Sequence, residues 1–180
     1  MRGWILPLLT VGASASAADP AQALTQAGGL AALILAIGAI PHPFAGAWSD
    51  RWGRRRVVSS IMIASAFCSL AIGWTLALPF GVAMVVGLIY GLTVTAESPV
   101  LSTAISEAAE PAYLGRTMAL QSAIGFAMGA IAPAAVGIVL DFASHFGATV
   151  VQAWGLAFST LGLVALLGPL CLSKVDGRRQ

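Results

Sequence analysis

Residues 46–56 read GAWSDRWGRRR, and this stretch determines how the rest of the chain is arranged. It holds four arginines and one aspartate, whereas the roughly twenty residues on either side contain no Lys, Arg, Asp or Glu. A short basic segment between two long apolar stretches is typical of a cytoplasmic loop that joins two membrane helices.

The composition agrees with a membrane protein. Of the 180 residues, 58% are hydrophobic and only 9% are charged, and the mean hydropathy is +0.90. Soluble domains carry about 25% charged residues, so this chain has too few charges to build a water-exposed shell. Its net charge of +2 and its short basic runs argue against a nucleic-acid-binding domain.

No site for a metal, a cofactor or catalysis is indicated by the sequence. Cys68 and Cys171 both lie inside apolar runs, and no further ligand has the spacing of a metal site. Phosphate-binding loops and nucleophile motifs are also missing from the sequence. We therefore expect no enzyme, no cofactor and no disulfide.

Five stretches are apolar and long enough to span a bilayer, which requires about 20 residues. They cover residues 24–48, 57–78, 80–106, 117–140 and 150–172. We therefore expect an all-α, polytopic transmembrane helix bundle, followed by a cytoplasmic tail over 173–180.

The basic residues predict the orientation of this bundle. If the 46–56 loop is cytoplasmic, threading the chain places all nine Lys and Arg residues on the cytoplasmic side. These are Arg2, Arg51, Arg54, Arg55, Arg56, Arg116, Lys174, Arg178 and Arg179. Asp19, Asp141 and His145 fall on the opposite side. We expect a multi-pass protein of the plasma or inner membrane with its C-terminus in the cytoplasm.

The first 23 residues form a short apolar segment that allows three interpretations. Residues 4–18 number about fifteen, which is short for a span. They are the trailing part of a sixth spanning helix whose start is missing, a secretory signal peptide cleaved near Ala15-Ser16-Ala17, or a short tilted helix. We favour the partial helix.

The pattern Gly-x-x-Ser-Asp-Arg-x-Gly-Arg-Arg-Arg resembles the signature loop of the major facilitator superfamily (MFS). Two later segments resemble the same family. Glu107, Glu110-Pro111 and Gly115-Arg116 are similar to its acidic and Arg-containing connection, and GFAMGAIAPAAVGIVLD to its Gly-rich helix. The resemblance covers about residues 24–172. Family members contain two six-helix halves, and this chain resembles one half, which we expect to be the C-terminal one.

The resemblance implies a secondary active transporter of a small solute that works by alternating access and is coupled to protons. The family's loop latches the cytoplasmic side, which implies a gating role for Gly46, Asp50, Arg51, Gly53, Arg54 and Arg55. Glu107, Glu110 and Arg116 are expected partners on the same side. The alternative role is a topology anchor whose arginines hold lipid phosphates.

The expected partners are a small-molecule substrate, the lipid bilayer, and either a second six-helix half or a second copy of the chain. Nucleic acid is not expected. The alternative function is a non-transporting membrane fragment or assembly subunit that needs a partner half.

Glu97 is the only acidic residue deep within a predicted span. An ionisable residue inside a membrane is costly and indicates function by default. Tyr90, Thr93 and Glu97 stand at i, i+3 and i+7, so they share one helix face. We expect this face to bind the coupling proton or a cationic group of the substrate. The alternative is a structural carboxyl hydrogen-bonded to Ser98 or to a neighbouring helix.

Overall fold

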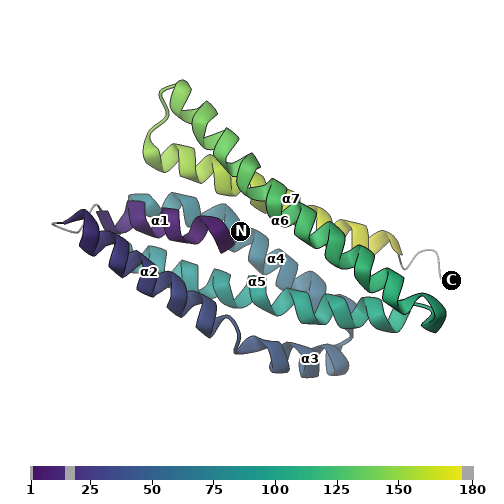
Figure 1. Cartoon of the computed structure of the whole chain (residues 1–180). Helices are drawn as coiled ribbons and strands as arrows, with labels where there is room; N and C mark the ends of the chain where they lie inside the picture. Colours follow the sequence, from purple (N-terminus) through teal and green to yellow (C-terminus); the bar gives the residue numbers. More distant parts are fainter. Residues whose placement is uncertain (1, 15–18, 176–180) are drawn as a thin grey trace.

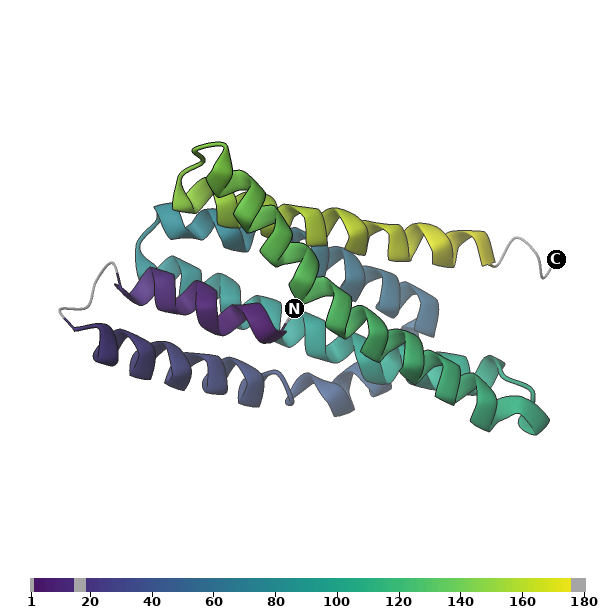
Figure 2. The same cartoon turned by 45° about the horizontal axis from the view of Figure 1, so that its top comes forward.

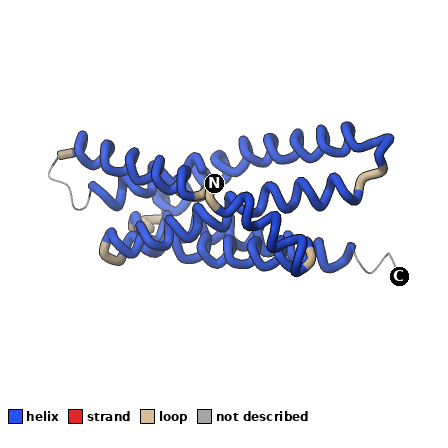
Figure 3. Tube along the Cα trace, turned by 90° about the horizontal axis from the view of Figure 1, so that it is seen from below, coloured by secondary structure: helices blue, strands red, loops and turns tan. Residues whose placement is uncertain are grey.

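The computed structural model describes residues 2–14 and 19–175, and all regular structure in this part is helical (Figures 1 and 3). In order, the elements are α1 (Arg2–Ser14), α2 (Pro20–Ile37), α3 (Pro41–Trp52), α4 (Arg54–Ile72), the 3-10 helix η1 (Gly73–Ala77), α5 (Phe80–Ala108), the 3-10 helix η2 (Pro111–Tyr113), α6 (Leu114–His145) and α7 (Val150–Val175).

Four helical segments among the described residues are long and apolar enough to cross a membrane. They are Arg54–Ala77, Phe80–Ala108, Pro111–His145 and Val150–Leu172, and they overlap the last four predicted spans. The helices run back and forth along one direction (Figure 1). One end of the bundle contains the α3–α4 junction and the start of α6, and therefore Arg51, Arg54, Arg55, Arg56 and Arg116. We call it the arginine end.

The stretch 24–48, which we expected to be one span, is divided between α2 and α3. Asp19 begins α2 by accepting a hydrogen bond from the Ala21 amide at 3.1 Å. The helix ends at Ile37, and a turn over 38–40 leads into α3, whose first residue is Pro41. Proline has no amide hydrogen to donate to the preceding turn, so it suits a helix start and breaks a helix interior.

The turn between α2 and α3 is held by α5. Gly38 is buried, and its carbonyl oxygen accepts a hydrogen bond from the Thr95 hydroxyl. A β-carbon at Gly38 would come within 3.1 Å of the Gly91 carbonyl oxygen, so the close approach of the two backbones favours glycine at this position. The break in the predicted span 24–48 is therefore held in place by α5.

The N-terminal helix α1 contributes to the core. Leu8 and Leu9 are 1% and 2% exposed. Leu8 packs in a cluster with Ile72, Tyr90 and Phe158, so α1 is in contact with the centre of the bundle. The candidate cleavage site at 15–17 lies outside the described residues, as do residues 176–180 of the predicted tail, whose first residues continue α7.

The closest helix contact in the core joins α4 and η1 to α7. A β-carbon on Gly73 would overlap the carbonyl group of Trp154, and one on Gly155 would overlap the Trp74 ring. The Ser69 hydroxyl, which is buried, donates to the Phe158 carbonyl oxygen at 3.0 Å. Small residues let the backbones approach, and a buried hydroxyl then links the two helices.

Helix α6 is the least buried of the long helices. Val136 and Ala143 are its only buried side chains, and Phe126 is 81% exposed. It crosses the bundle obliquely, from the start of α7 to the end of α5 (Figure 2). The Gln121 side-chain amide donates to the Ser102 hydroxyl at 3.0 Å and ties α6 to α5.

We predict that Gly73→Ala destabilises the bundle by roughly 1–3 kcal/mol, because the added methyl meets backbone that cannot move aside. Gly81→Ala is the matched control, since nothing lies within 4 Å of a β-carbon there. The control is expected to be neutral or slightly stabilising. Thermal unfolding midpoints in one detergent test this, and equal changes in the two variants would contradict the packing described.

Candidate functional site

Two helices meet at the arginine end through a single residue. Helix α3 ends at Trp52, α4 begins at Arg54, and Gly53 between them has φ +86°. A side chain at this φ is strained, so glycine is the residue that permits the turn. The turn orients the first residue of α4 toward the end of α5.

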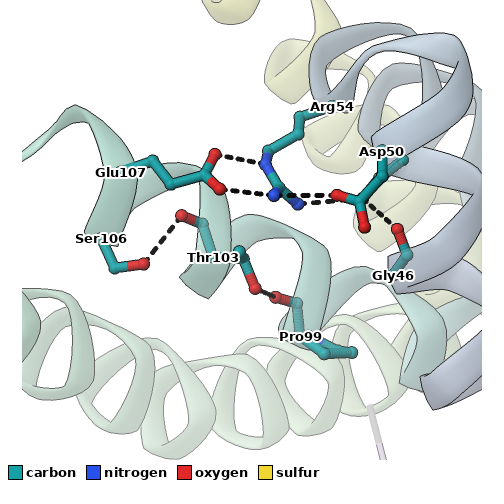
Figure 4. Close-up of polar contacts among 8 residues, drawn as sticks. Gly46, Asp50, Arg54, Pro99, Thr103, Ser106 and Glu107 are labelled. Atoms are coloured by element: carbon teal, nitrogen blue, oxygen red, sulfur yellow. Dashed lines mark hydrogen bonds and ion pairs between the residues drawn. The ribbon is translucent and has the colours of Figure 1, made fainter.

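Arg54 is the centre of a polar network that joins three helices (Figure 4). Its Nε and Nη2 atoms donate to the two carboxylate oxygens of Glu107 near the end of α5. Its Nη2 also lies 2.9 Å from Asp50 Oδ1 in α3, one helical turn earlier. A bidentate pair between a planar guanidinium and a carboxylate restricts direction as well as distance.

Ser49 is the fourth member of this network. It is 1% exposed, and its Oγ accepts a hydrogen bond from Arg54 Nη1 at 3.0 Å. The same hydroxyl donates to the Gly46 carbonyl oxygen at 2.7 Å. Sequence reasoning did not select Ser49, although it lies inside the signature pattern directly before Asp50.

The network is mostly open to water. The Arg54 side chain is 23% exposed, whereas Asp50 and Glu107 are 63% and 54% exposed. Exposed ion pairs contribute little to stability, so this one is better suited to choosing between two arrangements than to holding the fold. Its partners belong to separate helices, and it therefore breaks when α4 and α5 move apart.

The structure brings together only part of the predicted gating set. Gly46, Asp50, Gly53, Arg54 and Glu107 take part in the network or form its turn, as described above. Arg51 and Arg55 are exposed on either side of the turn. Glu110 precedes η2 and has no ion pair within the described chain, and Arg116 lies over the Tyr113 ring with its Cζ 5.9 Å from the ring centroid.

The second predicted group lies along α5, nearer the middle of the bundle. Tyr90 is 0% exposed and packs against Ile72, Trp154 and Phe158. This places the Tyr90 ring in the core between α4, α5 and α7, rather than against open space. Sequence reasoning grouped it with the substrate-binding face because a shared helix face does not reveal which neighbours cover it.

Thr93 and Glu97 are less covered than Tyr90. The Thr93 hydroxyl donates to the Tyr90 carbonyl oxygen at 3.0 Å, and Thr93 also lines a groove between α3 and α4. Glu97 is partly buried and has neither a hydrogen bond nor an ion pair with any described residue. Across the described residues, no three His, Cys, Asp or Glu side chains are grouped as a metal site.

Comparison with known proteins agrees with this geometry. The sequence profile of the Major Facilitator Superfamily matches residues 3–179 and so includes the helices, the Gly53 turn and both polar groups. No curated protein and no solved structure matches the chain. The match confirms the resemblance of the signature loop and the expected all-α membrane fold, and it excludes the enzyme class. The chain therefore belongs to the Major Facilitator Superfamily, a family of secondary transporters that carry small molecules across membranes.

Proposed function

We propose that this protein moves a small solute by alternating access and that a proton bound at Glu97 is coupled to the movement. The observation that carries the proposal is the position of Glu97, which is partly buried in α5, away from both helix ends and without a pairing partner among the described residues. An ionised carboxylate is costly in such a place, and binding a proton removes that cost.

The proton then biases the conformation. An ionised Glu97 favours an arrangement in which water or a cationic group of the solute reaches α5, whereas a protonated Glu97 tolerates a closed, dry arrangement. A two-state equilibrium shifts only as far as a ligand prefers one state, and a proton on an unpaired carboxyl supplies such a preference. Thr93 lies one turn away on the same face and is the proposed polar neighbour of the solute.

The arginine end is the proposed gate, and we place it in the cytoplasm together with the C-terminus. Support comes from the positive-inside pattern of the sequence and from the Arg54 network, which spans α3, α4 and α5. When the network is intact, α4 and α5 stay together at this end. Loss of the pair between Arg54 and Glu107 frees the two helices to separate.

A second candidate role is that of a subunit that transports only beside a second six-helix bundle or a second copy. The exposed face of α6 favours it. Phe126, Ile131 and Ile138 are 81%, 55% and 69% exposed, and nothing lies within 4 Å of a β-carbon at Gly125 or Gly129. Open glycines four residues apart are suited to close helix association in a membrane.

Glu97→Gln tests the coupling. We expect proton flux in proteoliposomes to fall by about tenfold or more, because the amide keeps the shape of the side chain and cannot exchange a proton. Glu110→Gln is the matched control, since Glu110 is exposed and lies beyond the end of α5. Thermal midpoints of the three proteins verify that they are equally folded. Equal flux in all three proteins would exclude a coupling role for Glu97.

Glu107→Gln tests the gate. Val58 is 2% exposed and packs against Ala96 and Val100 of α5, so it becomes more accessible when α4 and α5 separate. With Cys68 and Cys171 replaced by serine, we expect a maleimide to label Val58→Cys about two to five times faster in the Glu107→Gln protein, a modest effect typical of an exposed ion pair. Glu110→Gln should leave the rate unchanged. Identical rates in the Glu107→Gln and parent proteins would argue against the gate.

Gly129→Leu tests the assembly role. Within one bundle the added side chain meets no atoms near the backbone, so the thermal midpoint in detergent should stay unchanged. If α6 packs against a second bundle, the substitution should abolish both assembly, measured by molecular mass in detergent, and solute or proton flux. A protein that is a single bundle and shows full flux both in the parent form and as Gly129→Leu would rule out this second role.

A further inference from the structure

Two neighbouring cavities lie at the α3–α4 junction. One is lined mainly by polar side chains and the other mainly by apolar ones. The first, of about 810 Å³, is lined by Trp52, Gly53, three consecutive arginines (Arg54 to Arg56), Ser59 and Ser60. The second, of about 440 Å³, extends along the groove between α3 and α4 past Trp48, Val57, Ile61 and Ala64 to Thr93. Trp52, Arg56 and Ser60 line both, so the two cavities form one continuous amphipathic surface.

The polar cavity is suited to an anion. Its lining includes three arginines and two serines but no acidic side chain. Arg54 is already engaged by Asp50 and Glu107, whereas Arg56 is exposed and has no ion pair with any described residue. Arg56 is also the arginine that lines both cavities, and Ser60, an exposed hydroxyl one turn later, lines both with it.

The apolar cavity opens among side chains that belong in a bilayer interface. Trp48 and Trp52 are 60% and 68% exposed, and their rings stack with centroids 6.2 Å apart and planes 7° apart. Phe44, one turn before Trp48, is 60% exposed as well. Tryptophan is enriched where a membrane protein passes from the hydrocarbon to the headgroup region. In a chain that spans a membrane, such exposed rings are suited to contact lipid.

We propose that this surface binds one anionic phospholipid from the leaflet at the arginine end. The phosphate group is held by Arg56 and the Ser60 hydroxyl, and an acyl chain lies in the groove between α3 and α4 over Val57, Ile61 and Ala64. A lipid supplies a negative headgroup joined to an apolar chain, which matches the order of the two cavities. A soluble phosphate leaves the apolar half uncovered, and an uncharged lipid leaves Arg56 without a partner.

Occupancy has a structural consequence. The lipid touches both helices that the Gly53 turn connects, so it braces α3 against α4 next to the Arg54 network. A ligand that binds only this arrangement stabilises it in proportion to its affinity and concentration. The apolar cavity ends at Thr93, the proposed neighbour of the solute, but lipid binding itself requires neither a proton at Glu97 nor movement of α5.

The test is native mass spectrometry of the full chain in detergent, titrated with dioleoyl-phosphatidylglycerol. We expect one lipid to bind preferentially, and Arg56→Gln to weaken its binding by about fivefold, as expected for one arginine beside an anionic headgroup. The matched control is Arg51→Gln, because Arg51 is an exposed arginine of the same end that lines neither cavity. This control should bind the lipid like the unaltered protein.

Three further binding measurements identify the chemistry of the ligand. Dioleoyl-phosphatidylcholine should bind at least several times more weakly than phosphatidylglycerol, and inorganic phosphate should not compete with the lipid. Ala64→Leu, which fills the apolar groove and leaves the arginines in place, should also weaken lipid binding. The midpoints of thermal unfolding, measured in phosphatidylcholine, verify that the variants fold.

Equal losses in Arg56→Gln and Arg51→Gln would show a diffuse basic surface and overturn the proposal. Full competition by phosphate, or unchanged binding in Ala64→Leu, would show an anion site without an acyl-chain groove and would also overturn it.

Discussion

The guanidinium group of Arg54 connects three helices, α3, α4 and α5, at the arginine end. It reaches Glu107 in α5 with two nitrogens, Asp50 in α3 at 2.9 Å, and the buried Ser49 hydroxyl at 3.0 Å. This geometry depends on the turn at Gly53, which brings the first residue of α4 next to the end of α5. The two cavities that share Trp52, Arg56 and Ser60 lie at the same turn. One positive-φ glycine and one arginine therefore organise the whole arginine end.

The arrangement divides the bundle into a fixed part and a part suited to movement. Close backbone contacts at Gly73 and Gly155 join α4 and η1 to α7, and Ser69 links the same helices through a buried hydrogen bond. By contrast, α4 and α5 are joined at the arginine end by a partly exposed ion pair, whose contribution is small and reversible, and by the packing of Val58 against Ala96 and Val100. Helix α6 is attached mainly at its two ends and leaves an apolar face uncovered. Separation at the arginine end thus breaks a weak ion pair and one small apolar cluster, whereas separation along the α4–α7 contact breaks close backbone contacts and a buried hydrogen bond.

Much of this end could be predicted from the sequence, because charges are rare in a membrane chain and each one is informative. Arg54, Asp50 and Glu107 were selected in this way, and the family profile confirms the resemblance on which their proposed gating role rests. Ser49 was missed because a serine in a polar loop carries no pattern that reveals its burial. The break at Gly38 was missed because the stretch 24–48 is apolar enough overall to pass as one span, although Pro41 cannot donate a backbone hydrogen bond. Tyr90 shares a helix face with Glu97, and only the packing of α4 and α7 shows that its ring lies in the core.

The central claim is that the pair between Arg54 and Glu107 keeps the arginine end closed. The most direct measurement places spin labels at Ala47 of α3 and Ala108 of α5, both exposed, in a chain whose Cys68 and Cys171 are replaced by serine. Pulsed electron resonance in lipid nanodiscs then gives the distribution of distances between the labels. We predict one dominant short distance in the parent protein and a second, longer population in Glu107→Gln. Coinciding distributions in the two proteins would contradict the account.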